Sequence, residues 1–297
     1  MNEEEKIKIG VVALREYGGV GPRTFQLLMT HFGTPQGVFD SPAGAIAELP
    51  RMSDEREEQI RIAVDHFDLI RRRLAEYHDR GIEVVTVFDL GYPESLMEIG
   101  DTPPLLYWKG NFELLQRRCV AIVGSHEATS EGISEAVRYG KLIAQAGAVV
   151  VSGLAKGIDG AAHLGALQSE GRTIAVLGCG FDMMFPAENL PLSESISQNG
   201  LLLSEYAPET EVTVGRLIAR NRLIVGLSKS VIVVEVTPDS GGTASAIEET
   251  IKQGKALSSR PRGMRSSPKG WITSASRRSP ITRRLRRATP RHGRRWP

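Results

Sequence analysis

Short runs of β-branched residues, each ending at a glycine–serine turn, constrain the fold of this chain more than any other feature. Residues 120–125 read Val-Ala-Ile-Val-Gly-Ser, and residues 149–159 read Val-Val-Val-Ser-Gly-Leu-Ala-Lys-Gly-Ile-Asp. Continuous apolar runs are typical of strands buried on both faces. Small residues after such a strand let an anion approach the backbone, and a following helix offers free N–H groups. The segments therefore predict two neighbouring phosphate sites, although one such turn alone also occurs without a ligand.

The same alternation of strand and helix continues along the chain. Five buried strands are expected, near residues 119–124, 148–152, 173–178, 201–205 and 230–236. Helices fit between most of them, which favours an α/β fold with an extended Rossmann-like parallel sheet covered on both faces. A strand at 81–87 and an extended segment at 103–110 precede this region. Ligands of such sheets gather at the carboxyl ends of the strands.

A small N-terminal helical domain is expected over residues 1–80, followed by the Rossmann-like domain over 81–255. Apolar residues between 11 and 80 recur at spacings of three and four, and Gly19-Val-Gly-Pro-Arg23 interrupts them. This turn resembles a helix-hairpin-helix (SAM-like) motif, in which glycine N–H groups approach a DNA phosphate. A glycine turn between two packed helices without a ligand is the alternative.

The last segment, residues 256–297, is strongly basic. It holds thirteen Lys and Arg and no acidic residue, whereas residues 1–255 hold 24 Lys and Arg against 35 Asp and Glu. A basic tail of this kind usually indicates nucleic acid. The segment lacks hydrophobic periodicity, so both a natural disordered tail and the product of a reading-frame shift fit its composition.

Composition argues against several classes of protein. The sequence has no run of 18 apolar residues and does not begin like a signal peptide, so we expect a cytoplasmic protein without a membrane partner. Cys119 and Cys179 are the only cysteines and lack metal-ligand spacing. We expect structural thiols, no metal site, no cofactor and no catalytic Ser-His-Asp constellation.

Basic residues lie close to the predicted turns. Lys156 lies in the second turn, where its ammonium would meet a phosphate as a point charge. Arg216 and Ala219-Arg-Asn-Arg222 bring three arginines close together ahead of the strand near 230. Because uncompensated guanidinium groups repel one another, a phosphodiester between them is one explanation. Pairing with Glu205 or Glu235 is the other.

A third anion site is expected where the strand near 230–236 ends. Asp239-Ser-Gly-Gly-Thr243 follows that strand and precedes a helix, so the backbone of Gly241 and Gly242 is a candidate phosphate contact.

Six motifs, in order along the chain, resemble those of the DprA/Smf family of DNA-processing proteins. They are Gly124-Ser125, Ser152-Gly-Leu-Ala-Lys-Gly-Ile-Asp-Gly-Ala-Ala-His163, Ile174-Ala-Val-Leu-Gly-Cys-Gly180, Pro186-Ala-Glu-Asn189, Leu203-Ser-Glu-Tyr206 and Arg220-Asn-Arg-Leu-Ile-Val-Gly-Leu-Ser228. The resemblance covers residues 80–255 and implies an extended Rossmann domain that binds single-stranded DNA and forms a homodimer. It also implies help in loading a RecA-type recombinase during natural transformation, and no enzymatic activity.

The resemblance implies a set of phosphate contacts. It carries the family's DNA site onto Gly124, Ser125, Ser152, Gly153, Lys156, Arg220 and Asn221, with Arg222 nearby. His126 and Gly157 adjoin these positions and complete the predicted site. The family usually has arginine where this chain has His126, which is mostly neutral at pH 7 and should weaken DNA binding. The apolar strand expected after Lys255 is also replaced by the basic tail, which puts the edge of the sheet in doubt.

A different class of protein is the runner-up. Gly241-Gly-Thr-Ala-Ser-Ala-Ile-Glu248 resembles the phosphate turn of phosphoribohydrolases that cleave nucleoside monophosphates, with Glu248 at the catalytic position. Ala244 and Ser245 replace the glycine and threonine of that turn, which counts against the enzyme. A nucleotide-sensing domain on the same fold is a third reading.

Overall fold

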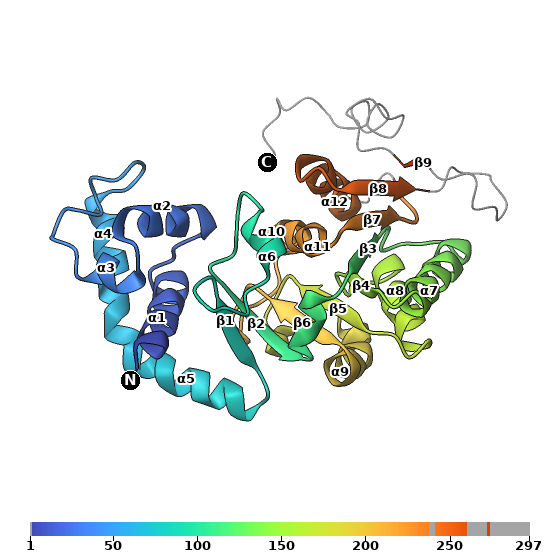
Figure 1. Ribbon diagram of the computed structural model, residues 1–297, viewed down its shortest axis with the longest axis horizontal. Coiled ribbons are helices and arrows are strands. Elements are labelled where there is room, and N and C mark those ends of the chain that lie inside the picture. Colours follow the sequence, from blue (N-terminus) through green and yellow to red (C-terminus); the bar gives the residue numbers. More distant parts are fainter. Residues whose placement is uncertain (1, 238–240, 260–271, 274–297) are drawn as a thin grey trace.

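The computed structural model describes residues 2–237, 241–259 and 272–273. The first part of the chain is helical, as the spacing of its apolar residues predicts, and we call residues 2–79 the helical front (Figure 1). Its elements are α1 (Glu3–Val12), a π-helical turn (Ala13–Tyr17), α2 (Pro22–Phe32), α3 (Pro35–Phe39), α4 (Asp54–Arg61), a 3-10 turn (Ile62–His66) and α5 (Phe67–Asp79). Gly19 has a φ of 59°, which favours glycine, and Pro22 starts α2, so a glycine turn precedes α2 at Gly19-Val-Gly-Pro.

A single nine-stranded sheet crosses the rest of the molecule, in the order β1-β2-β6-β5-β4-β3-β7-β8-β9. The strands are β1 (Glu83–Thr86), β2 (Leu105–Gly110), β3 (Cys119–Val123), β4 (Val149–Ser152), β5 (Thr173–Leu177), β6 (Leu201–Ser204), β7 (Ser230–Val233), β8 (Ala256–Ser259) and β9 (Ile272–Thr273). The strands from β6 through β8 pair in parallel, whereas β1, β2 and β9 join antiparallel at the two ends. The predicted α/β fold and all five buried strands are confirmed.

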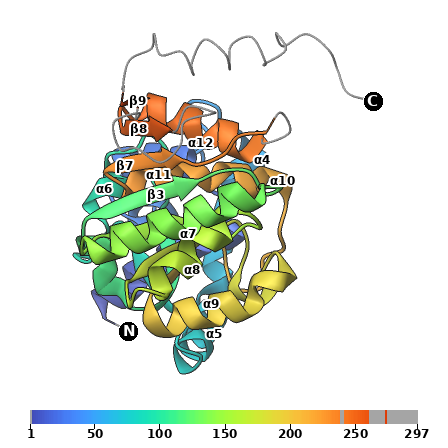
Figure 2. The same ribbon diagram turned by 90° about the vertical axis from the view of Figure 1, so that its right-hand side faces the viewer.

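Helices cover both faces of the sheet (Figures 1 and 2). They are α6 (Glu94–Met97), α7 (Ser130–Gln145), α8 (Ile158–Leu167), α9 (Leu190–Asn199), α10 (Val214–Ala219), α11 (Asn221–Leu227) and α12 (Gly241–Lys252). Because side chains alternate along a strand, Ile122 packs with α7 and α8 on one face. Its neighbours Ala121 and Val123 join the core formed with α6, α11 and α12 on the other face.

The helical front packs against the hairpin formed by β1 and β2. Ile9, Leu14 and Leu28 share one buried cluster with Val84 and Tyr107. The hairpin in turn pairs with β6 through β2. The helical front is therefore fixed to the sheet by a continuous apolar core.

Our expectation that the strand after Lys255 is lost is wrong. Ala256–Ser259 form β8, which pairs with β7 in parallel, and Leu257 is buried. Free N–H and C=O groups along β7 supply the pairing, so this short segment needs no β-branched residues to join the sheet. Residues 260–271 and 274–297 of the basic tail lie outside the described residues, as do Asp239 and its neighbours 238 and 240.

None of the helices that the structure describes is both long and apolar enough to span a membrane.

Candidate nucleic-acid interface

The site lies at the carboxyl ends of the parallel strands, where β3 and β7 are neighbours. The chain leaves β3 toward β4 on one side, whereas β7 arrives from β6 and extends the sheet on the other side. Ligands of doubly wound sheets bind at such a switch point. Here the Ser125 N–H donates to the carbonyl of Glu235 at 2.9 Å, and the Ser125 hydroxyl lies 3.1 Å from that of Thr237. The turns after β3 and β7 are thus held together.

The two glycine turns predicted to bind phosphate interlock. The Ile158 N–H donates to the carbonyl of Ser125 at 3.2 Å. Gly157 has a φ of 74°, and a Cβ at this position would collide with that same carbonyl. A Cβ at Gly124 would collide with the Ile158 side chain. These glycines are therefore required by the close approach of the two turns, and they place the N-terminus of α8 beside the end of β3.

Ser152 and Gly153 of the second turn have structural roles. The buried Ser152 hydroxyl donates to the carbonyl of Ile122 at 2.6 Å and so ties β4 to β3. The Gly153 N–H donates to the Asp159 carboxylate at 3.1 Å. Burial raises the pKa of Asp159, while the nearby charge of Arg220 opposes that rise. Ser152 and Gly153 thus shape the turn through contacts within the protein.

Arg220 is buried beneath this turn, with an exposed fraction of 5%. Its guanidinium donates to the carbonyl of Gly153 at 2.6 Å and also to the carbonyl of Val176. A Cβ at Gly153 would overlap that guanidinium. Burial lowers the pKa of Arg220, and the charge of Asp159 counteracts this. Arg220 therefore joins the ends of β4 and β5 from within.

The structure corrects the premise that the three arginines lack compensation. Arg222 is 8% exposed and donates to the Glu205 carboxylate at 2.7 Å, as the alternative interpretation expected, and to the carbonyl of Asp101 at 3.1 Å. Arg216 donates to the carbonyl of Glu211 and lies over the Tyr206 ring. No phosphodiester is needed to hold these groups close together, because each has its own partner in the protein.

Lys156 and His126 are the exposed basic side chains of the two turns. The Lys156 ammonium lies 2.6 Å from a carboxylate oxygen of Glu188, and both side chains are more than half exposed. The His126 ring lies 3.8 Å from the Glu127 carboxylate. Side-chain charge at this edge is therefore available from Lys156 and, when it is protonated, from His126.

Asn221 and Asn189 fasten neighbouring segments to the site. The Asn221 amide donates to the carbonyl of Gly242 at 2.9 Å, so it positions the first turn of α12, where Gly241 and Gly242 are exposed. The Asn189 amide donates to the carbonyls of Leu154 and Ala155. Sequence reasoning did not select Asn189, although it closes the Pro186-Ala-Glu-Asn189 motif.

The helix-hairpin-helix-like turn faces a cleft of about 480 Å³, which Arg222 also lines. Gly21, Pro22 and Arg23 line it together with Tyr206 and Ser245. Arg23 forms an ion pair with Asp101 at 2.5 Å. Contact between this hairpin and DNA stays a prediction.

Other candidate chemistry is not supported within the part of the chain that the structure describes. Both cysteines are free and buried, and burial raises the pKa of Cys119 to about 12, so they are structural thiols as expected. No cluster of His, Cys, Asp or Glu among the described residues fits a metal ion. His163 is buried, and burial lowers its pKa to about 3. Glu248 lies exposed on α12.

The family model of DNA recombination-mediator protein A matches residues 83–271. This chain belongs to that family, the DprA/Smf proteins. The Smf protein of Synechocystis sp. is 34% identical over 242 residues, which cover 79% of this chain and 60% of that protein. The curated DprA/Smf relatives of Synechocystis, Bacillus subtilis and Streptococcus pneumoniae are matched over 60, 63 and 60% of their length. The predicted family resemblance is confirmed.

Solved structures agree with this assignment. DNA processing protein A (DprA) from Streptococcus pneumoniae is 31% identical with a TM-score of 0.74, and the match covers 89% of this chain and 88% of that chain. DNA processing protein A from Helicobacter pylori, whose structure addresses its single-stranded DNA binding mode, is 32% identical with a TM-score of 0.56. That match covers 62% of this chain and 83% of the H. pylori chain.

Proposed function

We propose that this DprA/Smf protein binds single-stranded DNA through its phosphates at the carboxyl edge of the sheet. The observation that carries the proposal is the interlocking of the turns after β3 and β4 through Gly157 and Ser125, with Lys156 exposed beside them. Interlocked turns hold backbone groups in fixed positions, and the N-terminus of α8 favours negative charge there. The H. pylori relative, with its single-stranded DNA binding mode, supports this choice of ligand.

The proposed contacts bind the phosphate groups of the strand and do not distinguish its bases. His126, Lys156 and Gly157 would contact the strand directly. Ser125 is fully buried and, with Ser152, Gly153, Arg220 and Asn221, holds those contacts in place. Gly241 and Gly242 extend the site along α12. Gly124 is needed for the packing of the turn, and Arg222 acts through Glu205. Binding should depend little on base sequence and fall steeply with salt.

The wider role rests on membership in the family. We infer that the protein acts in DNA processing in the cytoplasm, as a homodimer that helps load a RecA-type recombinase onto DNA taken up during natural transformation. We also infer that it binds without catalysing a reaction. Ala244 adds a methyl group where a phosphoribohydrolase needs glycine, and Glu248 is exposed to solvent. Release of free base from nucleoside monophosphates, lost on Glu248→Gln, would instead establish the enzyme.

A titration of labelled oligonucleotide tests the DNA-binding site. We expect Lys156→Ala to weaken binding by roughly tenfold, because a hydrogen bond to a charged group contributes about 1.5 to 3 kcal/mol. Lys229→Ala is the matched control, since Lys229 is exposed just before β7 at the opposite edge of the sheet. The full chain is used throughout, so the basic tail contributes equally to all variants. Equal weakening by both substitutions would show that the tail or overall charge, and not this edge, binds DNA.

A further inference from the structure

The ion pair between Lys156 and Glu188 lies within the proposed phosphate site. Glu188 belongs to a 3-10 turn (Ala187–Asn189) that precedes α9, and one of its carboxylate oxygens lies 2.6 Å from the Lys156 ammonium. The Lys156 side chain is 54% exposed and that of Glu188 is 66% exposed. Exposed pairs of this kind stabilise a fold little. The position of Glu188 therefore calls for an explanation other than stability.

The protein holds Glu188 close to Lys156. The neighbouring Asn189 amide donates to the carbonyls of Leu154 at 2.9 Å and Ala155 at 3.2 Å, the two residues that precede Lys156. The segment that carries the carboxylate is thus bonded to the segment that carries the ammonium. The two charges stay near each other even when their direct contact is broken.

We propose that the Glu188 carboxylate is an internal competitor for the phosphate that Lys156 binds. This inference rests on the proposed function. A carboxylate and a phosphodiester each carry one negative charge and both accept hydrogen bonds from an ammonium, so one replaces the other at Lys156. Glu188 thereby determines which anions reach this part of the site.

The competition discriminates between a polymer and a single phosphate. A nucleic acid strand held at the Ser125 and Gly157 turns presents its next phosphate at high effective concentration, so it displaces Glu188 readily. A free phosphate or a nucleoside monophosphate lacks those further contacts and competes poorly.

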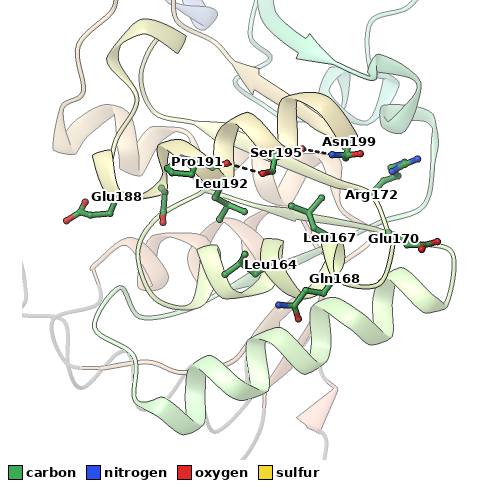
Figure 3. A pocket seen from close by; sticks show the side chains of 12 residues that line it. Leu164, Leu167, Gln168, Glu170, Arg172, Glu188, Pro191, Leu192, Ser195 and Asn199 are labelled. Atoms are coloured by element: carbon green, nitrogen blue, oxygen red, sulfur yellow. Dashed lines mark hydrogen bonds between the residues drawn. The ribbon is translucent and has the colours of Figure 1, made fainter.

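The displaced side chain has room to move. A groove of about 880 Å³ runs between α8 and α9 and is lined by Leu164, Leu167 and Leu192, with Glu188 at one end (Figure 3). The Glu188 side chain points away from these leucines (Figure 3). Rotation away from Lys156 would leave it beside this open groove.

A double-mutant cycle tests the competition. Glu188→Gln should strengthen the binding of an unstructured oligonucleotide two- to fivefold in the full chain, whereas Glu194→Gln, the same change at an exposed position of α9, should alter it less than 1.5-fold. In a Lys156→Ala background the effect of Glu188→Gln should disappear. If Glu188→Gln strengthens binding equally with and without Lys156, Glu188 acts by general repulsion and the proposal is wrong.

The ionisation of Glu188 gives a second readout that does not depend on affinity. Lys156 lowers the pKa of the Glu188 carboxyl. Carboxyl NMR titration should therefore show this pKa rising when a saturating oligonucleotide takes the ammonium, and also in Lys156→Gln without DNA. A Glu188 pKa that is unchanged while DNA binds at this edge would overturn the competition alone. Oligonucleotide binding that ignores Lys156→Ala would instead overturn the proposed function.

Discussion

The guanidinium of Arg220 donates a hydrogen bond to the main-chain carbonyl of Gly153 at 2.6 Å, linking residues 67 positions apart. A second bond from the same nitrogen reaches the carbonyl of Val176. The ends of β4 and β5 are therefore joined by a buried positive charge, which Asp159 balances. The sequence predicts Arg220 as a phosphate contact, whereas in the structure its guanidinium supports the turn from inside the protein.

Arg220→Ala should accordingly destabilise the fold by about 3 to 5 kcal/mol, because it leaves the carbonyls of Gly153 and Val176 without this donor and removes the positive charge near the buried Asp159. Chemical denaturation measures this change. Arg117→Ala, at an exposed position, is the control and should change stability by less than about 0.5 kcal/mol. A stable Arg220→Ala protein that has merely lost DNA affinity would return Arg220 to the role of a direct phosphate contact.

Gly157→Ala should separate the two turns of the site. Alanine disfavours the φ of 74°, and its Cβ would collide with the Ser125 carbonyl. We expect a loss of at least about 2 kcal/mol in stability, together with weaker oligonucleotide binding. Gly100→Ala, where a Cβ meets nothing within 4 Å, is the matched substitution and should leave the thermal midpoint within about 2 °C of the parent.

His126→Arg should strengthen oligonucleotide binding several-fold at low salt, because it adds a permanent charge to the first turn. The gain should shrink as salt is raised from about 50 to 300 mM, as expected for contact with phosphate. His78→Arg adds the same charge at the end of α5, in the helical front, and should have a much smaller effect. Equal gains from both substitutions would indicate attraction by net charge instead of a local contact.

Glu16 should make stability depend on pH. Burial raises the pKa of this carboxyl to about 7, against the opposing charge of Arg73 and with the help of Glu209, and the Tyr107 hydroxyl donates to it. Because the folded pKa lies above the ordinary value of 4.5, the protonated form stabilises the fold. That contribution is fully present below pH 4.5 and is lost as pH rises through about 7.

Denaturation midpoints between pH 5 and 8 measure this effect, which is on the order of 3 kcal/mol at most. Glu16→Gln should flatten the dependence, whereas Glu4→Gln, at an exposed position of α1, should leave it unchanged. An identical pH profile for the parent and Glu16→Gln would contradict the assignment.

The sequence predicted the sheet, and the meeting of the two glycine turns at one of its edges, for a physical reason. Strands buried on both faces read as continuous apolar runs, and ligands of parallel sheets meet at the strand ends, so Ser125 and Lys156 could be placed at one edge. The partners of the arginines could not be predicted. Arg220 bonds to main-chain carbonyls, which every residue carries, and only the packing of β4 against β5 decides which of them it reaches.

The missed strand β8 has a similar explanation. Ala256-Leu-Ser-Ser259 carries little β propensity, and the basic residues that follow hide its one buried apolar side chain, Leu257. Its conformation comes from pairing with β7, which is a tertiary effect. Local pattern reading is weakest where a neighbouring strand decides the structure.

The hairpin of β1 and β2 sends alternate side chains into two different cores. Val84, Leu105 and Tyr107 join the core of the helical front, whereas Val85 and Leu106 join that of the sheet. Both cores need this hairpin to stay packed. The helical front and the sheet should therefore unfold as one cooperative unit with a single calorimetric transition. Leu106→Ala should then lower the thermal midpoint of the helical front and of the sheet together.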